Sequence, residues 1–394
     1  MKRVVVCFLL LCLSLGLCAC GGKGQVDGGG SELEQLCAKA TTVTLSDAGA
    51  DIKGPGARFE NGVLTISTGG AYRLSGSLSD GQVVVDTGEE KQDVQLILDG
   101  VSLRCAGDAA LYIRRAGDTD IYTMPDTESR LVSGAERELV ADPNASGAAL
   151  LTEDDIDLHG PGSLIVEGYM NNGIGCKNDI DIRGGTCTIL AANNGLKGNE
   201  SVEISGGYVA ITCGNDGIKN SNAEKADKGS IQITGGSIVV QAGDQGLCAV
   251  KDIRITGGRL EVWAEADGLK AGTKSAPGKV EISGGDSQIV SGNDAIDAAA
   301  LTVSGGSLLA LGRDKDIKPT VNASVPCYAG KLKVPEGQVF TLCDERGEYL
   351  YACDPRREIK SAFLALDGLK SGESYALMTG AAGSMKQTGT VTLP

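Results

Sequence analysis

Apolar and polar positions alternate in a phrase that returns six times in the middle of the chain. Each copy is a triplet such as Ile-Asp-Ile or Val-Glu-Ile, followed by one further polar residue and a Gly-Gly pair. The copies begin at Ile180, Val202, Ile231, Ile253, Val280 and Leu301. Successive side chains of a strand point to opposite faces, so each triplet turns its two apolar residues to one side. The phrase therefore predicts a short strand with one buried face, repeated six times.

The spacing of the phrase indicates the fold class. The second glycines of the pairs are separated by 22, 29, 22, 27 and 21 residues. About 22 residues hold three short strands and three corners, which is one coil of a parallel β-helix. The Gly-Gly pair suits a corner that needs a positive φ, and the longer spacings fit insertions at 221–229 and 271–278. A sandwich lacks this spacing and a leucine-rich horseshoe needs helices, so we expect an all-β, right-handed parallel β-helix.

The pattern changes at both ends of the repeat and divides the chain into four parts. We expect a signal peptide at 1–20, a flexible tether at 21–40, the parallel β-helix at 41–319 and a small C-terminal β cap at 320–394. Within the cap, the alternation at 338–342 and 349–353 predicts a hairpin around Glu345, Arg346 and Gly347. A cap is expected because an open coil edge invites aggregation.

The N-terminal leader predicts where the protein resides. Lys2 and Arg3 precede an apolar stretch from Val4 to Leu17 that is too short for a confident membrane span. The segment 17–22 resembles a bacterial lipobox, with Cys20 as the residue that would be lipidated. We therefore expect a cell-surface, extracytoplasmic protein attached to the membrane only through its lipid. An ordinary secretory signal with a chance cysteine is the alternative.

Composition removes several kinds of chemistry. His159 is the single histidine, and it lies in a Gly-rich corner, so a histidine-based nucleophile triad is excluded and we expect a solvated His159. Nine scattered cysteines follow the leader without a C-x-x-C pair, which disfavours a zinc site or a disulfide framework. Cys187 and Cys213 occupy strand positions and are expected in the core. The net charge of −15 makes nucleic acid an unfavourable partner.

The chemistry that remains lies in the turn after each second strand. These turns are rich in asparagine and aspartate, and coils that stack at about 4.8 Å bring their side chains together. Clustered oxygen ligands of this kind suit calcium. The predicted calcium ligands are Asn193, Asn194, Asn215, Asp216, Asp244, Asp267, Asn293, Asp294 and Asp297. A second corner column, which includes Asp154, Asp179, Glu200 and Asp252, is a weaker candidate. Asn and Asp are also favoured in turns without any metal, and Asn ladders alone stabilise such corners.

Lysines follow several of these turns at one shared position. Lys197, Lys219 and Lys270 each lie two residues after the turn glycine, with Lys318 at the equivalent place. An ammonium group there could bind an anionic ligand or, with a lowered pKa, act as a base. A solvated corner lysine is the alternative for each of them.

Upstream phrases at 95–102 and 148–156, the central repeat, and the tail at 369–375 together resemble a known family. It is the calcium-dependent, carbohydrate-binding β-helix family of bacterial cell surfaces, whose fold is similar to that of family 9 polysaccharide lyases. The resemblance implies calcium in the β-helix and binding of acidic plant polysaccharide such as polygalacturonate. Gln245, Ala266 and Ala295 depart from the family's turn pattern, which puts particular calcium ligands in doubt.

Three functional hypotheses follow. In the first, calcium on the acidic corners bridges the protein to uronate carboxylates, and the protein only binds. In the second, the protein is a calcium-dependent lyase in which Lys219 or Lys270 removes the proton. The third is a structural or adhesive surface protein. We favour binding, because a lyase usually needs an arginine beside the lysine and none recurs in the lysine column.

Overall fold

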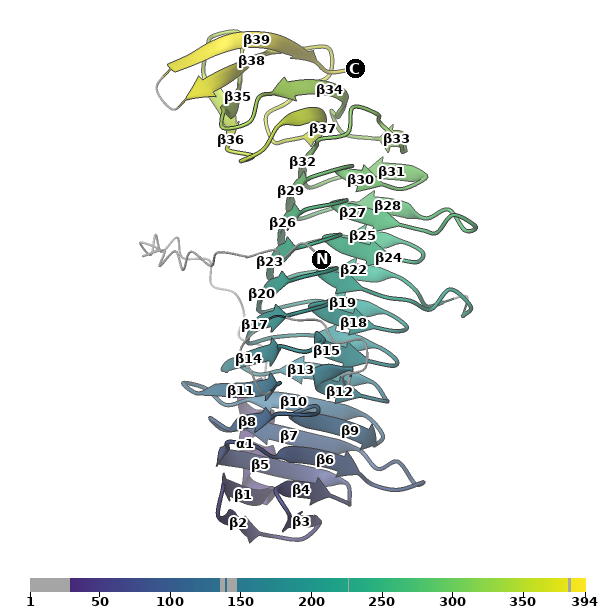
Figure 1. The fold of residues 1–394 in the computed structure, drawn as a ribbon. Coiled ribbons are helices and arrows are strands. Elements are labelled where there is room, and N and C mark those ends of the chain that lie inside the picture. The colour runs from purple at the N-terminus through teal and green to yellow at the C-terminus, as the bar shows by residue number, and fades with distance from the viewer. Residues whose placement is uncertain (1–28, 135–138, 140–146, 226, 382–383) are drawn as a thin grey trace, which may run out of the picture.

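The computed structural model describes residues 29–134, 139, 147–225, 227–381 and 384–394. The predicted signal peptide, Cys20 and residues 21–28 of the expected tether lie outside the described residues. Within them, the chain forms a right-handed parallel β-helix whose C-terminal end is covered by a β cap joined to the last coil by strand pairing (Figure 1). The predicted fold class is therefore confirmed.

Each coil contributes one strand to each of three faces, which we name A, C and B in the order in which the chain meets them. The strands of face A are β5 (Gly70–Leu78), β7 (Val94–Leu98), β10 (Thr119–Thr123), β13 (Ile156–His159), β16 (Ile180–Ile182), β19 (Val202–Ile204), β22 (Ile231–Ile233), β25 (Ile253–Ile255), β28 (Lys279–Ile282), β31 (Ala300–Val303) and β33 (Thr320–Ala323). Those of face C are β8 (Ser102–Cys105), β11 (Glu128–Ser133), β14 (Ser163–Gly168), β17 (Thr186–Ala191), β20 (Tyr208–Cys213), β23 (Ser237–Ala242), β26 (Arg259–Ala264), β29 (Asp286–Ser291) and β32 (Ser307–Gly312). Those of face B are β4 (Val63–Ile66), β6 (Gln82–Asp86), β9 (Leu111–Arg115), β12 (Ala148–Thr152), β15 (Asn172–Cys176), β18 (Leu196–Gly198), β21 (Ile218–Lys219), β24 (Leu247–Ala249), β27 (Leu269–Ala271) and β30 (Ile296–Asp297).

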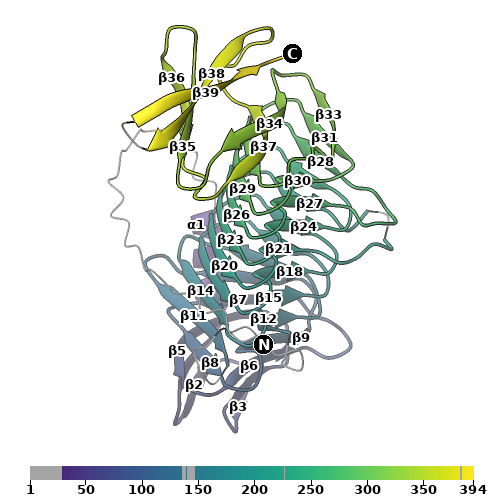
Figure 2. The same ribbon diagram turned by 45° about the horizontal axis from the view of Figure 1, so that its top comes forward.

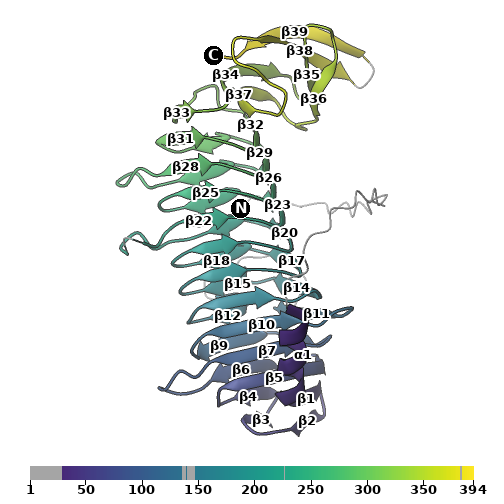
Figure 3. The ribbon, with the colours of Figure 1, turned by 180° about the vertical axis from the view of Figure 1, so that it is seen from behind.

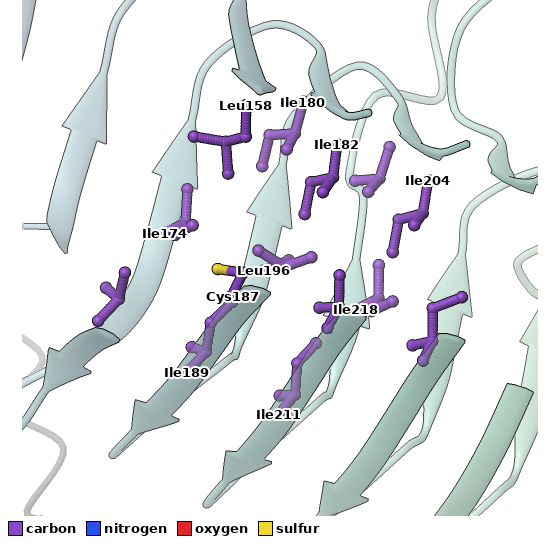
Figure 4. Close-up of a cluster of buried hydrophobic side chains, with 14 of the residues drawn as sticks. Leu158, Ile174, Ile180, Ile182, Cys187, Ile189, Leu196, Ile204, Ile211 and Ile218 are labelled. Atoms are coloured by element: carbon purple, nitrogen blue, oxygen red, sulfur yellow. The ribbon is translucent and has the colours of Figure 1, made fainter. Parts of the chain in front are cut away.

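The apolar residues of the repeated phrase form ladders inside the helix. Ile182 stacks on Ile204, and Ile204 on Ile233, in a parallel register that continues along face A. These side chains are at most 1% exposed, and Figure 4 shows the ladders of all three faces meeting in one core. Complete burial of one such side chain stabilises the fold by about 1.5–3 kcal/mol. Cys187 and Cys213 are buried in the same core, as expected.

The Gly-Gly pairs make the corner between faces A and C. Gly207 has a φ of 76°, which residues other than glycine adopt only at a cost. A Cβ on the preceding Gly206 would lie 2.3 Å from the carbonyl oxygen of Arg183 in the coil below. The two predicted insertions follow β21 and β27, at the corner between faces B and A.

The N-terminal end differs from the expected tether. Residues 29–39 form α1 (Gly29–Lys39), which packs Leu33 and Leu36 against Ile97 and Tyr122 on the outer side of face A (Figure 3). The expectation of a flexible tether up to residue 40 is therefore wrong for this segment, because two apolar side chains have a surface to cover. No helix in the described ranges is long and apolar enough to span a membrane.

The first coil is closed by strands that pair with their neighbours in the chain. They are β1 (Thr41–Ser46), β2 (Gly49–Lys53) and β3 (Ala57–Glu60). The pairs β1–β2 and β3–β4 are antiparallel, and β1 also runs parallel to β5. The free edge of the stack is thus reduced to short strands.

The C-terminal cap lies over the other end of the stack (Figure 2). Its strands are β34 (Tyr328–Val334), β35 (Val339–Cys343), β36 (Tyr349–Cys353), β37 (Ile359–Ala365), β38 (Ser374–Ala381) and β39 (Ser384–Thr392). The β35–β36 hairpin is antiparallel, as predicted, and β37 pairs with β32 of the last coil. The helical stacking extends slightly beyond residue 319, because β33 still pairs with β31.

Candidate functional site at the corner between faces C and B

The Asn/Asp-rich turns stack at the corner that joins face C to face B. The inner position of these turns forms one column, which we call the inner column: Asn172, Asn194, Asp216, Gln245, Asp267 and Asp294. Apart from half-buried Gln245, these polar side chains are at most 6% exposed. Buried polar groups have to be hydrogen-bonded or charge-paired, so the chemistry of this column depends on how each member finds a partner.

In the early coils the inner column is an asparagine ladder. The Oδ1 atom of Asn172 accepts hydrogen bonds from the backbone N–H of Asn194 at 3.1 Å and from its Nδ2 group at 2.7 Å. The Oδ1 atom of Asn194 accepts from the Asn215 amide at 3.0 Å and from the backbone N–H of Asp216 at 3.3 Å. Asn193 donates to Asn171 in the same way. These three predicted ligands, Asn193, Asn194 and Asn215, therefore take part in the ladder that turn chemistry alone accounts for.

In later coils the inner column is charged and each aspartate pairs with a lysine. Asp216 lies 2.5 Å from the ammonium of Lys219, and Asp267 lies 3.2 Å from that of Lys270. Each lysine lies three residues after its aspartate, and the short turn brings the two charged groups together. Lys219 and Lys270 are thus ion-paired with the aspartates of their own turns, a pairing that the sequence pattern did not predict.

Three predicted calcium ligands converge in the last two coils. One carboxylate oxygen from each of Asp267, Asp294 and Asp297 lies within 4.8 Å of the others. We call these three residues the carboxylate cluster. Asp297 occupies the position that is lysine in the coil below, since it pairs in register with Lys270. The sequence change from Lys to Asp at this position creates the cluster.

Two ammonium groups partly neutralise the carboxylate cluster. Lys318 lies 2.5 Å from Asp294 and 3.3 Å from Asp297, and Lys270 lies 3.5 Å from Asp297. Three carboxylates and two ammoniums leave a net charge of −1. The lysine side chains are 45% and 33% exposed, so both can turn towards solvent. The donor set fits a hard divalent cation such as calcium, which prefers carboxylate oxygens.

The remaining predicted ligands lie outside the carboxylate cluster. Asp244 accepts a hydrogen bond from the Gln245 amide at 3.2 Å. The backbone carbonyl of Asn293 accepts N–H groups of Arg313 and Asp314, which fixes the turn after the last coil. The departure at Gln245 thus interrupts the acidic column between Asp216 and Asp267.

The electrostatic surroundings favour charged lysines at this corner. Burial lowers the pKa of Lys219, but the hydrogen bond and charge of Asp216 outweigh it, so that the pKa is raised. The pKa of Lys270 is raised in the same way by Asp267 and Asp297. Burial also raises the pKa of Asp294, although Lys318 opposes this. Both candidate base residues are therefore held as ammonium ions, which is unfavourable for proton abstraction.

Lys197 differs from the other two lysines of the row. The residue three positions before it is Asn194 rather than aspartate. Lys197 makes no ion pair or hydrogen bond with any described residue. Of the three lysines predicted to bind a ligand, Lys197 is the one with an uncommitted charge.

The second acidic column, at the corner between faces B and A, is neutralised by basic partners from other loops. Asp154 pairs with Lys91 at 2.5 Å, and Asp252 pairs with Arg254 at 2.8 Å. Asp179 and Glu200 both contact Lys228 of the first insertion, and Glu200 also contacts Lys225. The insertion thus supplies positive charge to this column, an association that no regular spacing in the sequence reveals.

The sequence pattern did not predict that Asp120, Asp157 and His159 lie together. His159 ends β13 with Nε2 2.9 Å from Asp120 Oδ1, and its ring stacks on Tyr122 at 4.8 Å. Asp157 belongs to the same group. The expectation of a solvated His159 is therefore wrong, since its side chain is only 21% exposed. The sequence spacing gave little indication of this group, because 37 residues separate Asp120 from Asp157, which is well above the coil period of about 22 residues.

Comparisons with known proteins find similar sequences and a similar fold. A 37% identical relative over 192 residues is a carbohydrate-binding domain-containing protein of Acetivibrio thermocellus. The match covers 48% of this chain and 65% of the relative, so the chain spans less than two thirds of that protein's length. A solved structure, the polysaccharide lyase-like protein from C. thermocellum in a gadolinium derivative, is similar with a TM-score of 0.52 and 29% identity. That likeness covers 72% of this chain and 97% of the other.

A family model also matches most of the β-helix and much of the cap. It is described as a carbohydrate-binding domain-containing protein, and it matches residues 60–316 and 251–381. These ranges together extend over far more than half of the chain. The chain belongs to the family of carbohydrate-binding domain-containing proteins.

Proposed function

We propose that the protein binds an acidic polysaccharide such as polygalacturonate through calcium held by Asp267, Asp294 and Asp297. The observation that carries the proposal is the carboxylate cluster, in which three carboxylates from two stacked coils lie within 4.8 Å of one another. Family membership supports a carbohydrate as the ligand.

The charge of the molecule supports a cation at this place. A chain with a net charge of −15 repels a polyuronate. Calcium supplies, when bound, a positive charge to which a uronate carboxylate can be attracted. Asp267 and Asp294 are buried and fixed by the corner, whereas Asp297 is 27% exposed and lies nearest to solvent. The cluster thus presents one accessible carboxylate above two fixed ones.

A calcium-dependent lyase is the second candidate, because the similar solved structure is described as polysaccharide lyase-like. Its base would be Lys219 or Lys270. Both form ion pairs with aspartates, which favours the protonated form of each. We therefore prefer binding without cleavage. Incubation with polygalacturonate and calcium separates the two, since a lyase produces unsaturated ends that absorb ultraviolet light and binding does not.

The proposed calcium site is tested by titration calorimetry with calcium. Asp297→Asn keeps the shape of the side chain and removes one charge, so we expect at least tenfold weaker calcium binding. Asp51→Asn removes an exposed carboxylate on β2, far from the cluster, and serves as the matched control. Equal calcium affinity in Asp297→Asn and the unmodified protein would exclude the cluster as the calcium site.

We further propose that Cys20, which lies outside the described residues, carries a lipid and holds the protein on the cell surface. The lipobox-like segment and the apolar leader support this. Cys20→Ser is expected to release the protein from the membrane fraction into the soluble one. Retention of that variant on membranes would rule out lipidation at Cys20.

A further inference from the structure

We infer that the hollow beside Lys197 on face B is a second subsite, which binds the carboxylate of a uronate directly and without metal. The inference rests on the proposed function, since it names how the same polysaccharide is held at a place away from the carboxylate cluster.

The hollow lies along the outward row of face B. Leu151, Gly175 and Lys197 follow one another in the outward row of face B, because β12, β15 and β18 pair in register. Gly175 is buried at the base of this row, where an added Cβ would lie 3.0 Å from Cβ of Ala148. The cavity beside it has a volume of about 390 Å³, and Lys177, Asn199 and Ser221 form its rim. A volume of this order accommodates one sugar ring.

The charge in the hollow is positive although the protein is acidic. Lys219 and Lys270 are neutralised by aspartates three residues earlier, whereas Asn194 has no charge to offer Lys197. Lys177, on the rim, is paired with Glu153. Among the described residues the ammonium of Lys197 has no acidic partner, and a carboxylate is the complementary group.

The rim adds a neutral donor. The hydroxyl of Ser221 donates to Oδ1 of Asn199 at 2.8 Å. The hydrogen bond occupies the oxygen of the amide. The Nδ2 group of Asn199 has no acceptor among the described residues and can donate to a ligand. A carboxylate has two oxygens and binds best to a cation together with such N–H donors. Lys197 and Asn199 supply that combination.

The hollow and the carboxylate cluster lie on one line along the helix. Lys197, Lys219, Cys248, Lys270 and Asp297 are successive register partners on face B. Four coils at about 4.8 Å each separate Lys197 from Asp297, which is roughly 19 Å. A single extended polyuronate could therefore engage both places, and the second contact would benefit from a high effective concentration.

Binding of trigalacturonate in the presence of EDTA tests the inference, because EDTA removes the contribution of calcium. We expect measurable binding by the unmodified protein and at least tenfold weaker binding by Lys197→Met, which keeps the aliphatic stem. Lys333→Met, an exposed lysine on β34, is the charge-matched control and should bind as the unmodified protein does. Absence of binding in EDTA, or equal binding by Lys197→Met, would overturn the inference.

The two proposals fail separately. Calcium titration of Lys197→Met should match that of the unmodified protein, since Lys197 does not contact the carboxylate cluster. Loss of the EDTA-resistant binding with intact calcium binding at Asp297 supports the hollow as a distinct subsite. If Asp297→Asn loses only the calcium-dependent part of the binding, the carboxylate cluster is affected. The EDTA-resistant binding through Lys197 should then remain.

Discussion

At the scale of single residues, small changes at one repeated position decide what the corner between faces C and B can do. An asparagine at the inner position continues a neutral ladder, as at Asn194. An aspartate neutralises the lysine that follows it, as at Asp216. At the end of the stack, Asp297 replaces that lysine and completes the carboxylate cluster. The same backbone thus holds a ladder, an ion pair or a potential metal site.

The ammonium of Lys318 competes with a cation for the carboxylate cluster. It lies 2.5 Å from Asp294 and 3.3 Å from Asp297. Lys318→Met changes the net charge of the cluster from −1 to −2, so we expect calcium affinity to rise about tenfold. Calorimetric titration of both proteins with calcium measures the change. Unchanged or weaker affinity would show that Lys318 does not occupy the place of the ion.

The ion pair between Asp86 and Arg115 predicts how the free energy of unfolding depends on pH. Hydrogen bonds from Arg115 to the carboxylate of the half-buried residue Asp86, assisted by Arg114, hold the pKa of Asp86 well below its usual value. A lowered folded-state pKa means that stability is present above the unfolded pKa of about 4 and is lost as pH falls towards the folded pKa. Asp86 therefore stabilises the fold at neutral pH.

Asp86→Asn is expected to lower the free energy of unfolding at pH 7 by about 1.5–3 kcal/mol, the usual contribution of hydrogen bonds to charged groups. The difference between the two proteins should shrink as the pH is lowered below 4. Urea unfolding at pH 7 and at pH 3 provides both values. A difference that stays constant or grows at low pH contradicts the assignment.

At the scale of elements, the absence of a side chain at the turn glycine leaves room for a β-branched side chain on the strand of the next coil. A Cβ on Gly217 would lie 2.2 Å from Cγ1 of Val240, and one on Gly268 would lie 2.2 Å from Cγ2 of Ile289. Ala295 occupies this turn position in the last regular coil, where Ala310 takes the place of Ile289 in register. The alanine that departs from the repeat is thus accompanied by a smaller residue above it.

Gly217→Ala tests this packing. The added methyl group has to displace Val240 and the backbone of Gly246, so we expect a loss of about 1–3 kcal/mol in unfolding free energy. Gly107→Ala is the control, because a Cβ there meets nothing within 4 Å. Chemical denaturation compares the two. A loss no greater than that of Gly107→Ala would mean that the coils do not stack as closely as described.

The local periodicity of the sequence predicted the strands well. It could not predict the ion pairs and packing contacts between segments that are distant in the sequence. The alternation at 180–182 and 202–204 determines how the two strands pair, because a slip by one residue would expose Ile182 and Ile204. The association of Lys228 with Asp179 depends on how an insertion folds back. The docking of α1 depends on the outward residues Ile97 and Tyr122, which have no repeating signal.

For the candidate site, the sequence pointed to nine turn residues, of which the structure brings three together. Asp267, Asp294 and Asp297 come together, whereas Asn193 and Asn215 are hydrogen-bonded to neighbouring asparagines. Whether an amide joins a ladder or faces an ion depends on the residue in the next coil. That information lies in the stacking and not in any one turn.

At the scale of the whole molecule, the fold is a long stack with both ends covered. The cap packs Phe340, Leu342 and Leu364 against Leu309 and Leu311 of the last coil. The hollow lies at β18 and the carboxylate cluster at β27 and β30, strands of face B that follow one another along the stack towards the cap (Figure 1). An extended polymer that follows the stack would therefore pass both places.

The affinity for polygalacturonate in calcium and in EDTA is the most direct test of this account. The account predicts binding at least tenfold tighter in millimolar calcium than in EDTA. It also predicts that Asp297→Asn loses this difference while Asp51→Asn keeps it. Equal affinity in calcium and EDTA, or a calcium effect that survives Asp297→Asn, would contradict the central claim that the carboxylate cluster holds the ion through which the polysaccharide is bound.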